Sequence, residues 1–176
     1  MTRLLGISGS LRRASTNTHL LQNAAEMFGA DTYTRASIDL PLYNGDLEAE
    51  SGVPEAVQTL ARQIGEADAI IISTPEYNKG VSGALKNAFD WISRIKTSPL
   101  AGKPVAIMSA SAGRSGGERA QYALRHCLVP FDARVLNGPE VLVAQSHDAF
   151  DADGLLIADS YRDFLGRQME ALRAMT

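Results

Sequence analysis

Short apolar runs alternate with longer segments of helical periodicity along the chain. Arg3 to Ser8 is a mostly apolar run that stops at Gly9 and Ser10, which predicts a buried strand followed by a loop. From Asn17, a residue type that often caps helices, apolar residues recur at helical spacing until Gly29. The chain therefore opens with a strand, a loop and a helix.

The same unit recurs further along the chain. Pro54 opens a second amphipathic segment that leads into the strand Ala69 to Thr74, and a later apolar run predicts the strand Val105 to Met108. Helical periodicity follows each of these strands and covers the C-terminal segment. A strand near Thr32 to Arg35 is weakly marked, and the last strand lies somewhere in Arg134 to Val143.

Strands that alternate with helices of about ten or more residues indicate βαβ units, whose right-handed crossovers give a parallel sheet covered on both faces. About five strands fit a flavodoxin-like fold with strand order 2-1-3-4-5, or a truncated Rossmann topology. In either case the ligand binds beyond the carboxyl ends of the strands, so the loops after the first, third and fourth strands are the candidate site. The length suits a single domain over residues 1–176.

Composition and charge exclude several classes. A formal net charge of −3 is too small to indicate a nucleic-acid partner or a basic membrane surface. The single cysteine, Cys127, has no internal partner and indicates a reducing compartment. No apolar run approaches the roughly 20 residues that span a bilayer. His19, His126 and His147 lack metal-ligand spacing, so we expect no metal site. Together with the lone cysteine and the short apolar runs, the composition predicts a cytoplasmic protein without a membrane partner.

The loop after the first strand is rich in hydroxyl groups. Ser10, Ser15, Asn17 and Thr18 surround an expected helix N-terminus, whose free N–H groups and positive partial charge suit a phosphate, and Arg12 adds a formal charge. The loop lacks the Gly-Lys-Ser/Thr ending of a P-loop and the second and third glycines of the dinucleotide fingerprint, which favours a monophosphate. The alternative is that its polar residues only cap the helix.

The loop after the third strand reads Pro-Glu-Tyr-Asn-Lys-Gly at 75–80. Proline and glycine fix its path, so consecutive N–H groups can point at the edge of a flat heterocycle while Tyr77 offers an aromatic face. Alternatively, the Glu76 carboxylate bonds nearby backbone and Ser82 caps the next helix. On that helix, Phe89 and Trp91 have core spacing, which favours packing or subunit contact over stacking on a ligand.

Two motifs in these loops carry a family resemblance. Gly-Ser-Leu-Arg-x-x-Ser-x-Asn at Gly9 to Asn17, and Pro-Glu-Tyr-Asn-x-Gly-x-x-Gly-x-Leu-Lys-Asn-Ala-x-Asp-Trp at Pro75 to Trp91, resemble the NADPH-dependent FMN reductase family, which includes quinone, chromate and azo-dye reductases. The resemblance extends over nearly the whole chain. It implies that the FMN phosphate is held by Ser10, Arg12, Ser15, Asn17 and Thr18. It further implies that ribityl and ring lie along Pro75, Glu76, Tyr77, Asn78 and Gly80, with a looser third flavin-facing segment at Ser109, Ser111 and Gly113.

The resemblance also implies the activity. FMN would carry the hydride chemistry at N5, so no residue is expected to serve as a dedicated catalytic acid or base. NADPH or NADH would donate electrons, and small molecules such as free flavin, quinones, chromate or azo compounds would accept them, in a homodimer or homotetramer. Two alternatives stay open: a flavodoxin-type electron shuttle that docks protein partners, which the mildly acidic charge disfavours, and a flavin-binding module without turnover.

Overall fold

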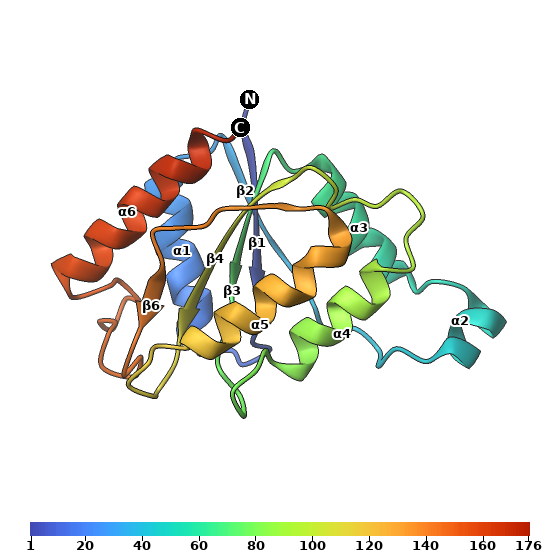
Figure 1. The fold of residues 1–176 in the computed structure, drawn as a ribbon, viewed down its shortest axis with the longest axis horizontal. Helices are drawn as coiled ribbons and strands as arrows, with labels where there is room; N and C mark the ends of the chain where they lie inside the picture. The colour runs from blue at the N-terminus through green and yellow to red at the C-terminus, as the bar shows by residue number, and fades with distance from the viewer.

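A parallel sheet forms the centre of the molecule, and the computed structural model describes residues 1–176 (Figure 1). The strands span Arg3–Ser8 (β1), Thr32–Ala36 (β2), Ala69–Ser73 (β3), Pro104–Ala110 (β4), Arg134–Val135 (β5) and Val141–Val143 (β6). The helices span Thr16–Phe28 (α1), Gly45–Ser51 (α2), Glu55–Glu66 (α3), Gly83–Ile92 (α4), Glu118–Leu128 (α5) and Asp159–Arg173 (α6), and a 3₁₀ turn covers Val129–Phe131. The order β2-β1-β3-β4-β5, with β6 also paired to β4, confirms the expected flavodoxin-like fold.

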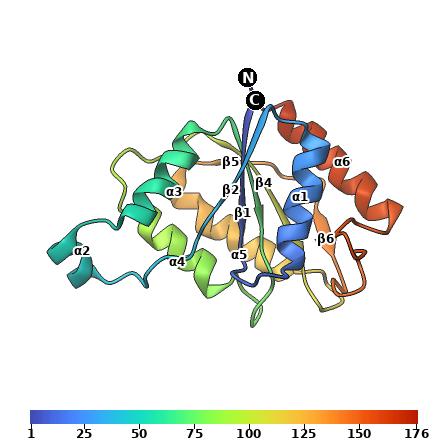
Figure 2. The ribbon, with the colours of Figure 1, turned by 180° about the vertical axis from the view of Figure 1, so that it is seen from behind.

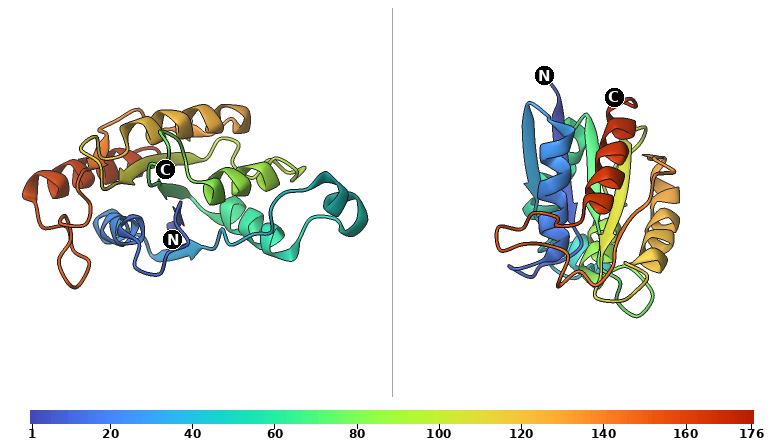
Figure 3. Two further views of the ribbon diagram at one scale, coloured as in Figure 1. Left: turned by 90° about the horizontal axis from the view of Figure 1, so that it is seen from below. Right: turned by 90° about the vertical axis from the view of Figure 1, so that its left-hand side faces the viewer.

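Two apolar clusters hold helices against opposite faces of the sheet. Successive side chains of β1 point to opposite faces, so Leu4 packs with α1 and α6, whereas Leu5 packs with α3, α4 and α5. The same two layers are visible in Figures 2 and 3, where α2 stands away from both. β1, β3 and β4 are covered on both faces, which is why each reads as a continuous apolar run.

Phe89 and Trp91 on α4 belong to the interior, with 5% and 0% of their surface exposed. The Trp91 indole N–H donates to the carbonyl of Pro41 at 2.7 Å, and its ring meets Tyr43 edge-on at a centroid distance of 5.0 Å. The expected packing role is therefore confirmed. Both side chains are used for packing within one chain, and a subunit contact made by this helix or its flanks stays a prediction.

The first helix begins earlier than the sequence pattern suggests. Ser15 is the N-cap of α1, and Asn17 lies inside the first turn with 3% of its surface exposed. Asn17 was expected to be the capping residue, and this expectation is wrong because its side chain is used for tertiary contacts. Gly29 ends the helix as expected, in the left-handed conformation at φ 66° that glycine adopts readily.

The last strand is divided into two short segments, β5 and β6, rather than one. The chain leaves the sheet between them at Pro139, which has no N–H for a strand ladder. Side chains take over the backbone carbonyls there: Arg125 donates to Leu136 at 3.0 Å, and Gln168 donates to Pro139 at 2.8 Å. Both segments pair with β4 in parallel, which confirms the predicted position of the last strand beside the fourth.

The carboxyl ends of β1, β3 and β4 lie side by side at the lower edge of the sheet in Figure 1. Ser8 pairs with Ser73 in the register, and Ser73 pairs with Met108. The three loops that follow these strands therefore start within one small region. None of the helices has the length and apolar character needed to cross a membrane.

Candidate functional site

The first loop leads from β1 into the N-terminus of α1. Ser15, the N-cap residue, is 4% exposed, and its hydroxyl makes no capping hydrogen bond. The first-turn N–H groups of Thr16 and Asn17 have no intrahelical partner, and a helix carries a positive partial charge at this end. The free N–H groups at the N-terminus of α1 are therefore not capped by the Ser15 side chain and can bind an anion.

Ser10, Arg12 and Thr18 surround this N-terminus with further donors. The Ser10 hydroxyl oxygen accepts from the N–H of Arg12 at 3.3 Å, and the Thr18 hydroxyl donates to the hydroxyl oxygen of Ser8 at 3.1 Å. The Arg12 side chain is exposed and takes part in none of the ion pairs of the structure. These three predicted residues are brought together around one loop.

Asn17 serves a different purpose through its side chain. Its amide oxygen accepts from the Ser73 hydroxyl at 2.8 Å and from the N–H of Ala110 at 3.0 Å, while its amide nitrogen donates to the carbonyl of Ala110 at 2.9 Å. One buried amide therefore connects α1 to the ends of β3 and β4. Only the backbone N–H of Asn17 remains available to a ligand.

The second loop is built around a tight turn. Tyr77 and Gly80 exchange two backbone hydrogen bonds at 3.1 and 3.0 Å, and the two central residues, Asn78 and Lys79, have φ values of 50° and 65°. Positive φ at both central positions is the signature of a type I′ turn. Tyr77, Asn78 and Lys79 are exposed, and Tyr77 retains 52% of its surface. The turn therefore projects from the carboxyl edge of the sheet with an aromatic ring at its base.

Buried contacts fix the base of this turn against the first loop. A Cβ atom on Gly9 would lie 3.1 Å from Pro75 Cδ and 3.2 Å from the carbonyl oxygen of Ser73, so the two loops pack directly on one another. The Ser82 hydroxyl donates to the carbonyl of Gly9 at 2.5 Å and accepts from the N–H of Leu85 at 3.2 Å. Ser82 therefore caps α4, as expected, and also joins the first two loops.

Glu76 points to the third loop. Its carboxylate accepts from the N–H of Arg119 in the first turn of α5 at 3.2 Å, and a second oxygen lies 3.7 Å from the Arg119 guanidinium. A carboxylate at a helix N-terminus is favourable for both the free N–H groups and the helix dipole. The alternative reading of Glu76, in which it bonds nearby backbone, describes its side chain in this structure.

The third loop is held from within by a buried serine. Ser109 is 0% exposed; its hydroxyl donates to the carbonyl of Gly116 at 2.6 Å and accepts from the Gln121 amide at 2.9 Å. A hydroxyl so placed shapes the loop and has no surface for a ligand. Of the other two residues expected here, Ser111 is half-buried and Gly113 is exposed.

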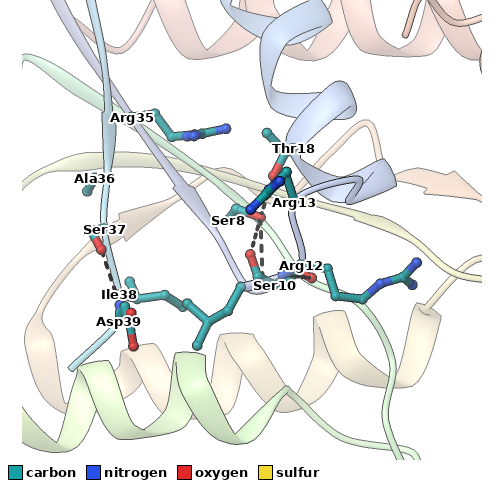
Figure 4. Close-up of a pocket in the computed structure, with 11 residues that line it drawn as sticks. Ser8, Ser10, Arg12, Arg13, Thr18, Arg35, Ala36, Ser37, Ile38 and Asp39 are labelled. Atoms are coloured by element: carbon teal, nitrogen blue, oxygen red, sulfur yellow. Dashed lines mark hydrogen bonds between the residues drawn. The ribbon is translucent and has the colours of Figure 1, made fainter. Parts of the chain in front are cut away.

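Sequence reasoning missed one wall of the site. A cavity of about 300 Å³ lies between the first loop and the end of β2, and Arg35, Ser37 and Asp39 line its far side (Figure 4). Arg13, next to the predicted Arg12, lines the near side. The second strand is only weakly marked in the sequence, so the candidate site included the loops after the first, third and fourth strands and left out the end of the second. The sole signal was Arg35 at the end of that strand.

The donors gathered at this edge fit a phosphate monoester. The hydroxyls of Ser10 and Ser15, the guanidinium of Arg12 and the free N–H groups of α1 all come from one loop and the helix it enters, whereas the Thr18 hydroxyl donates to Ser8. Beside them, the type I′ turn at 77–80 offers the N–H groups of Asn78 and Lys79 and an exposed tyrosine. These features define a flavodoxin-like protein whose carboxyl sheet edge carries groups of the kind that bind a mononucleotide.

Comparison with known proteins agrees with this class. Residues 2–148 match the family described as NADPH-dependent FMN reductase. The chain is 46% identical to an NAD(P)H-dependent FMN reductase of Pseudomonas aeruginosa, over 97% of this chain and 93% of the relative. It is 42% identical to the quinone reductase of Escherichia coli K12, over 96% and 92% of the two chains.

A solved structure gives the same result. The flavoenzyme NAD(P)H:(acceptor) oxidoreductase FerB of Paracoccus denitrificans superposes with a TM-score of 0.87 at 32% identity, covering 99% of this chain and 96% of its own. The chain belongs to the NADPH-dependent FMN reductase family. Membership confirms the expected enzyme class and the expected cofactors, FMN with NAD(P)H.

Proposed function

We propose that this protein is an FMN-dependent NAD(P)H oxidoreductase that reduces small acceptors by hydride transfer through flavin N5. The observation that carries the proposal is the pairing of two loops at one edge: a phosphate-type loop at the N-terminus of α1, and an exposed type I′ turn packed against it through Gly9 and Pro75. The first suits the phosphate end of a flavin mononucleotide, and the second suits its ring.

The residues divide into those that hold the cofactor and those that shape the loops. Ser10, Arg12, Ser15 and Thr18 hold the phosphate, and Asn17 contributes through its backbone N–H. Pro75, Tyr77, Asn78 and Gly80 lie along the ribityl chain and the ring, and Ser111 and Gly113 close the site from the third loop. The side chains of Asn17, Glu76 and Ser109 position these loops, because each is engaged by protein partners.

When bound, FMN supplies the hydride chemistry itself, so the polypeptide has to bind, orient and bias the charge of the ring. The N–H groups of Tyr77 and Gly80 bond each other's carbonyls, so those of Asn78 and Lys79 would be the ones to face the ring edge and favour negative charge there. Gly80 and the left-handed conformation of Asn78 and Lys79 set the direction of these N–H groups. No proton transfer by a side chain is required in this scheme.

The acceptors we propose are small oxidants: free flavin, quinones, chromate or azo compounds. Tyr77, Asn78 and Lys79 leave the turn open to solvent, and an open ring face admits flat or small molecules in sequence with the nicotinamide. We also propose a homodimer or homotetramer, since closed symmetric assembly is the commonest arrangement of soluble homo-oligomers.

Stopped-flow mixing tests the activity directly. We expect the FMN-loaded protein to lose its flavin absorbance when mixed with NADPH or NADH under anaerobic conditions, and to regain it when a quinone is added. A flavin that NADPH and NADH both leave oxidised would contradict the reductase proposal and favour the shuttle or the binding module. Reduction by nucleotide without reoxidation by quinone, chromate or free flavin would contradict the proposed acceptors alone.

A further inference from the structure

The cavity between the first loop and β2 has an unusual set of walls. On the β2 side it is lined by Arg35 and Ser37, and on the loop side by Ser10, Arg13 and Thr18. Figure 4 shows the Arg35 side chain extending from β2 into the space before the loop, while Arg12 extends away from β2. At about 300 Å³ the cavity has room for a phosphate group together with part of the molecule that carries it.

The charges in this cavity are unbalanced. Arg12, Arg13 and Arg35 line it, and none of them belongs to an ion pair. The one carboxylate on its wall is Asp39, which is exposed. Because the Arg12 side chain extends away from β2, Arg13 and Arg35 supply the positive charge of the cavity. Positive groups on a concave wall without carboxylate partners create a positive potential, which attracts an anion.

The hydroxyls on the loop side are already ordered by protein contacts. Ser8 links this wall, because its hydroxyl oxygen accepts from the Thr18 hydroxyl at 3.1 Å and from the N–H of Ser10 at 3.3 Å. On the opposite side the Ser37 hydroxyl oxygen accepts from the N–H of Asp39 at 3.3 Å, which leaves the Ser37 proton free to donate. The cavity is therefore preformed, with donors on both walls and fixed positions for the hydroxyls.

We propose that Arg35 and Arg13 bind a phosphomonoester dianion in this cavity, so that the phosphate site extends from the N-terminus of α1 to the end of β2. The inference rests on the proposed function, because two phosphomonoesters occur in that reaction: the 5′-phosphate of FMN and the 2′-phosphate of NADPH. Planar guanidinium groups suit either, since they bind phosphate oxygens in pairs.

Binding measurements on the purified protein separate the two sources. The probes are FMN against riboflavin, and adenosine 2′,5′-diphosphate against adenosine 5′-monophosphate, titrated by fluorescence or calorimetry into the wild type, R35Q, R13Q and R35K. R3Q is the matched control: Arg3 is exposed at the start of β1, at the opposite edge of the sheet, and its loss changes the net charge equally. Arg35 and Arg13 donate no side-chain hydrogen bond within the chain, so these variants should keep the wild-type melting temperature.

We expect R35Q and R13Q to weaken one of the phosphorylated probes by about tenfold or more, with its partner lacking that phosphate unchanged. R35K should recover part of the affinity, and R3Q should show none of the loss. A loss confined to FMN assigns the cavity to the flavin phosphate, and a loss confined to the 2′,5′-diphosphate assigns it to NADPH. Unchanged affinity for both in R35Q and R13Q would overturn the proposal. Failure of the proposed function is distinct, because it appears in the wild type as binding without flavin reduction.

Discussion

Asn17 shows how one polar side chain can connect three elements of the candidate site through contacts within the protein. It is buried, and its amide satisfies the Ser73 hydroxyl together with both the N–H and the carbonyl of Ala110. Buried polar groups are expensive to leave unpaired, so this amide fixes the separation of α1, β3 and β4. The hydrogen bonds of Asn17 to Ser73 and Ala110 thereby fix the relative positions of the three loops.

Replacement of Asn17 by alanine should therefore act on stability. Three buried hydrogen bonds lose a partner, and we expect the free energy of unfolding to fall by about 2–4 kcal/mol. Urea unfolding followed by circular dichroism measures the change. N137A is the control, because Asn137 is exposed and its side chain makes no hydrogen bond, and it should stay within about 0.5 kcal/mol of wild type. A stable N17A protein that no longer binds FMN would instead make the side chain a direct ligand.

Tyr33 gives a residue-level dependence on pH. Burial raises the pKa of the Tyr33 phenol above its ordinary value of 10.0, and the nearby charge of Arg35 lowers it in part. Because the folded state holds this proton more tightly than the unfolded state, the stabilisation is complete below pH 10 and is lost as the pH rises above 10.

We accordingly expect the free energy of unfolding of Y33F to fall less than that of the wild type between pH 9 and pH 11, a range centred on the ordinary tyrosine pKa of about 10. Urea unfolding at several pH values measures the difference. Y122F is the comparison, since Tyr122 is 55% exposed on α5 and its replacement should leave the wild-type pH profile intact. Parallel profiles for Y33F and wild type would show that the phenol titrates equally in both states.

At the residue scale, the sequence located the loops at the carboxyl edge of the sheet more reliably than the partners of their side chains. Ser10, Arg12 and Thr18 lie around the α1 N-terminus, and their role toward a phosphate stays a prediction. Ser109 and Glu76 are polar residues in the same loops, but their side chains form hydrogen bonds within the protein. The sequence alone does not show which hydrogen-bond partner a hydroxyl or a carboxylate will have. Only the folded chain decides between these partners.

The loop between β4 and α5 depends on glycine at two adjacent positions. Gly116 and Gly117 have φ values of 60° and 94°, and a Cβ on Gly116 would lie 2.6 Å from the backbone carbonyl carbon of Leu142. Backbone atoms cannot move aside as the end of a side chain can. The loop therefore contacts the β6 strand too closely for any other residue.

Gly116 and Gly113 make a matched pair for testing this element. G116A should destabilise the protein by more than about 2 kcal/mol, because the positive φ and the clash with Leu142 act together. G113A should change stability by less than about 0.5 kcal/mol, since a Cβ there meets open space. Thermal and urea unfolding of both variants provide the measurement. Equal stability of the two would mean that the loop can relax away from β6.

Element boundaries were predictable where the pattern was strong and unpredictable where side chains replace backbone pairing. β1, β3 and β4 are buried on both faces and were found as apolar runs. β2 is an edge strand with only Ala36 fully buried, so its pattern is weak. α2 buries no residue; Asn44 caps it, and Glu48 pairs with Arg94 on a distant segment at 2.9 Å, which no local pattern encodes.

At the scale of the whole molecule, the alternation of strands and helices left two topologies, flavodoxin-like and truncated Rossmann, and the family resemblance favoured the first. Parallel strands joined by helices leave few arrangements, and the switch point then places the site without reference to any single residue. The division of the chain into one domain over 1–176, and its assembly into a dimer or tetramer, remain predictions. They depend on surfaces rather than on periodicity, and exposed apolar residues such as Leu42 and Val129 are where an interface can be sought.

The distribution of charge over the molecule leads to the last prediction. The protein carries a net charge of −3, yet Lys79 on the second loop and Arg114 on the third are both exposed and belong to no ion pair. Two positive groups at the mouth of the site can attract an anionic nicotinamide nucleotide even when the protein as a whole is mildly acidic. Such attraction acts across several ångströms of solvent, so added salt should screen it.

We expect R114E to raise the KM for NADPH by about two- to fivefold at low ionic strength while changing kcat little, because attraction shared by ground state and transition state appears in KM first. The difference between R114E and wild type should shrink as salt lowers the Debye length from about 10 Å at 0.1 M to about 3 Å at 1 M. R3E carries the same change of charge at the opposite edge of the sheet and should behave as wild type. A nucleotide KM that responds neither to salt nor to R114E would remove the steering role of these side chains and leave the reductase proposal standing, because hydride transfer does not depend on how the nucleotide arrives.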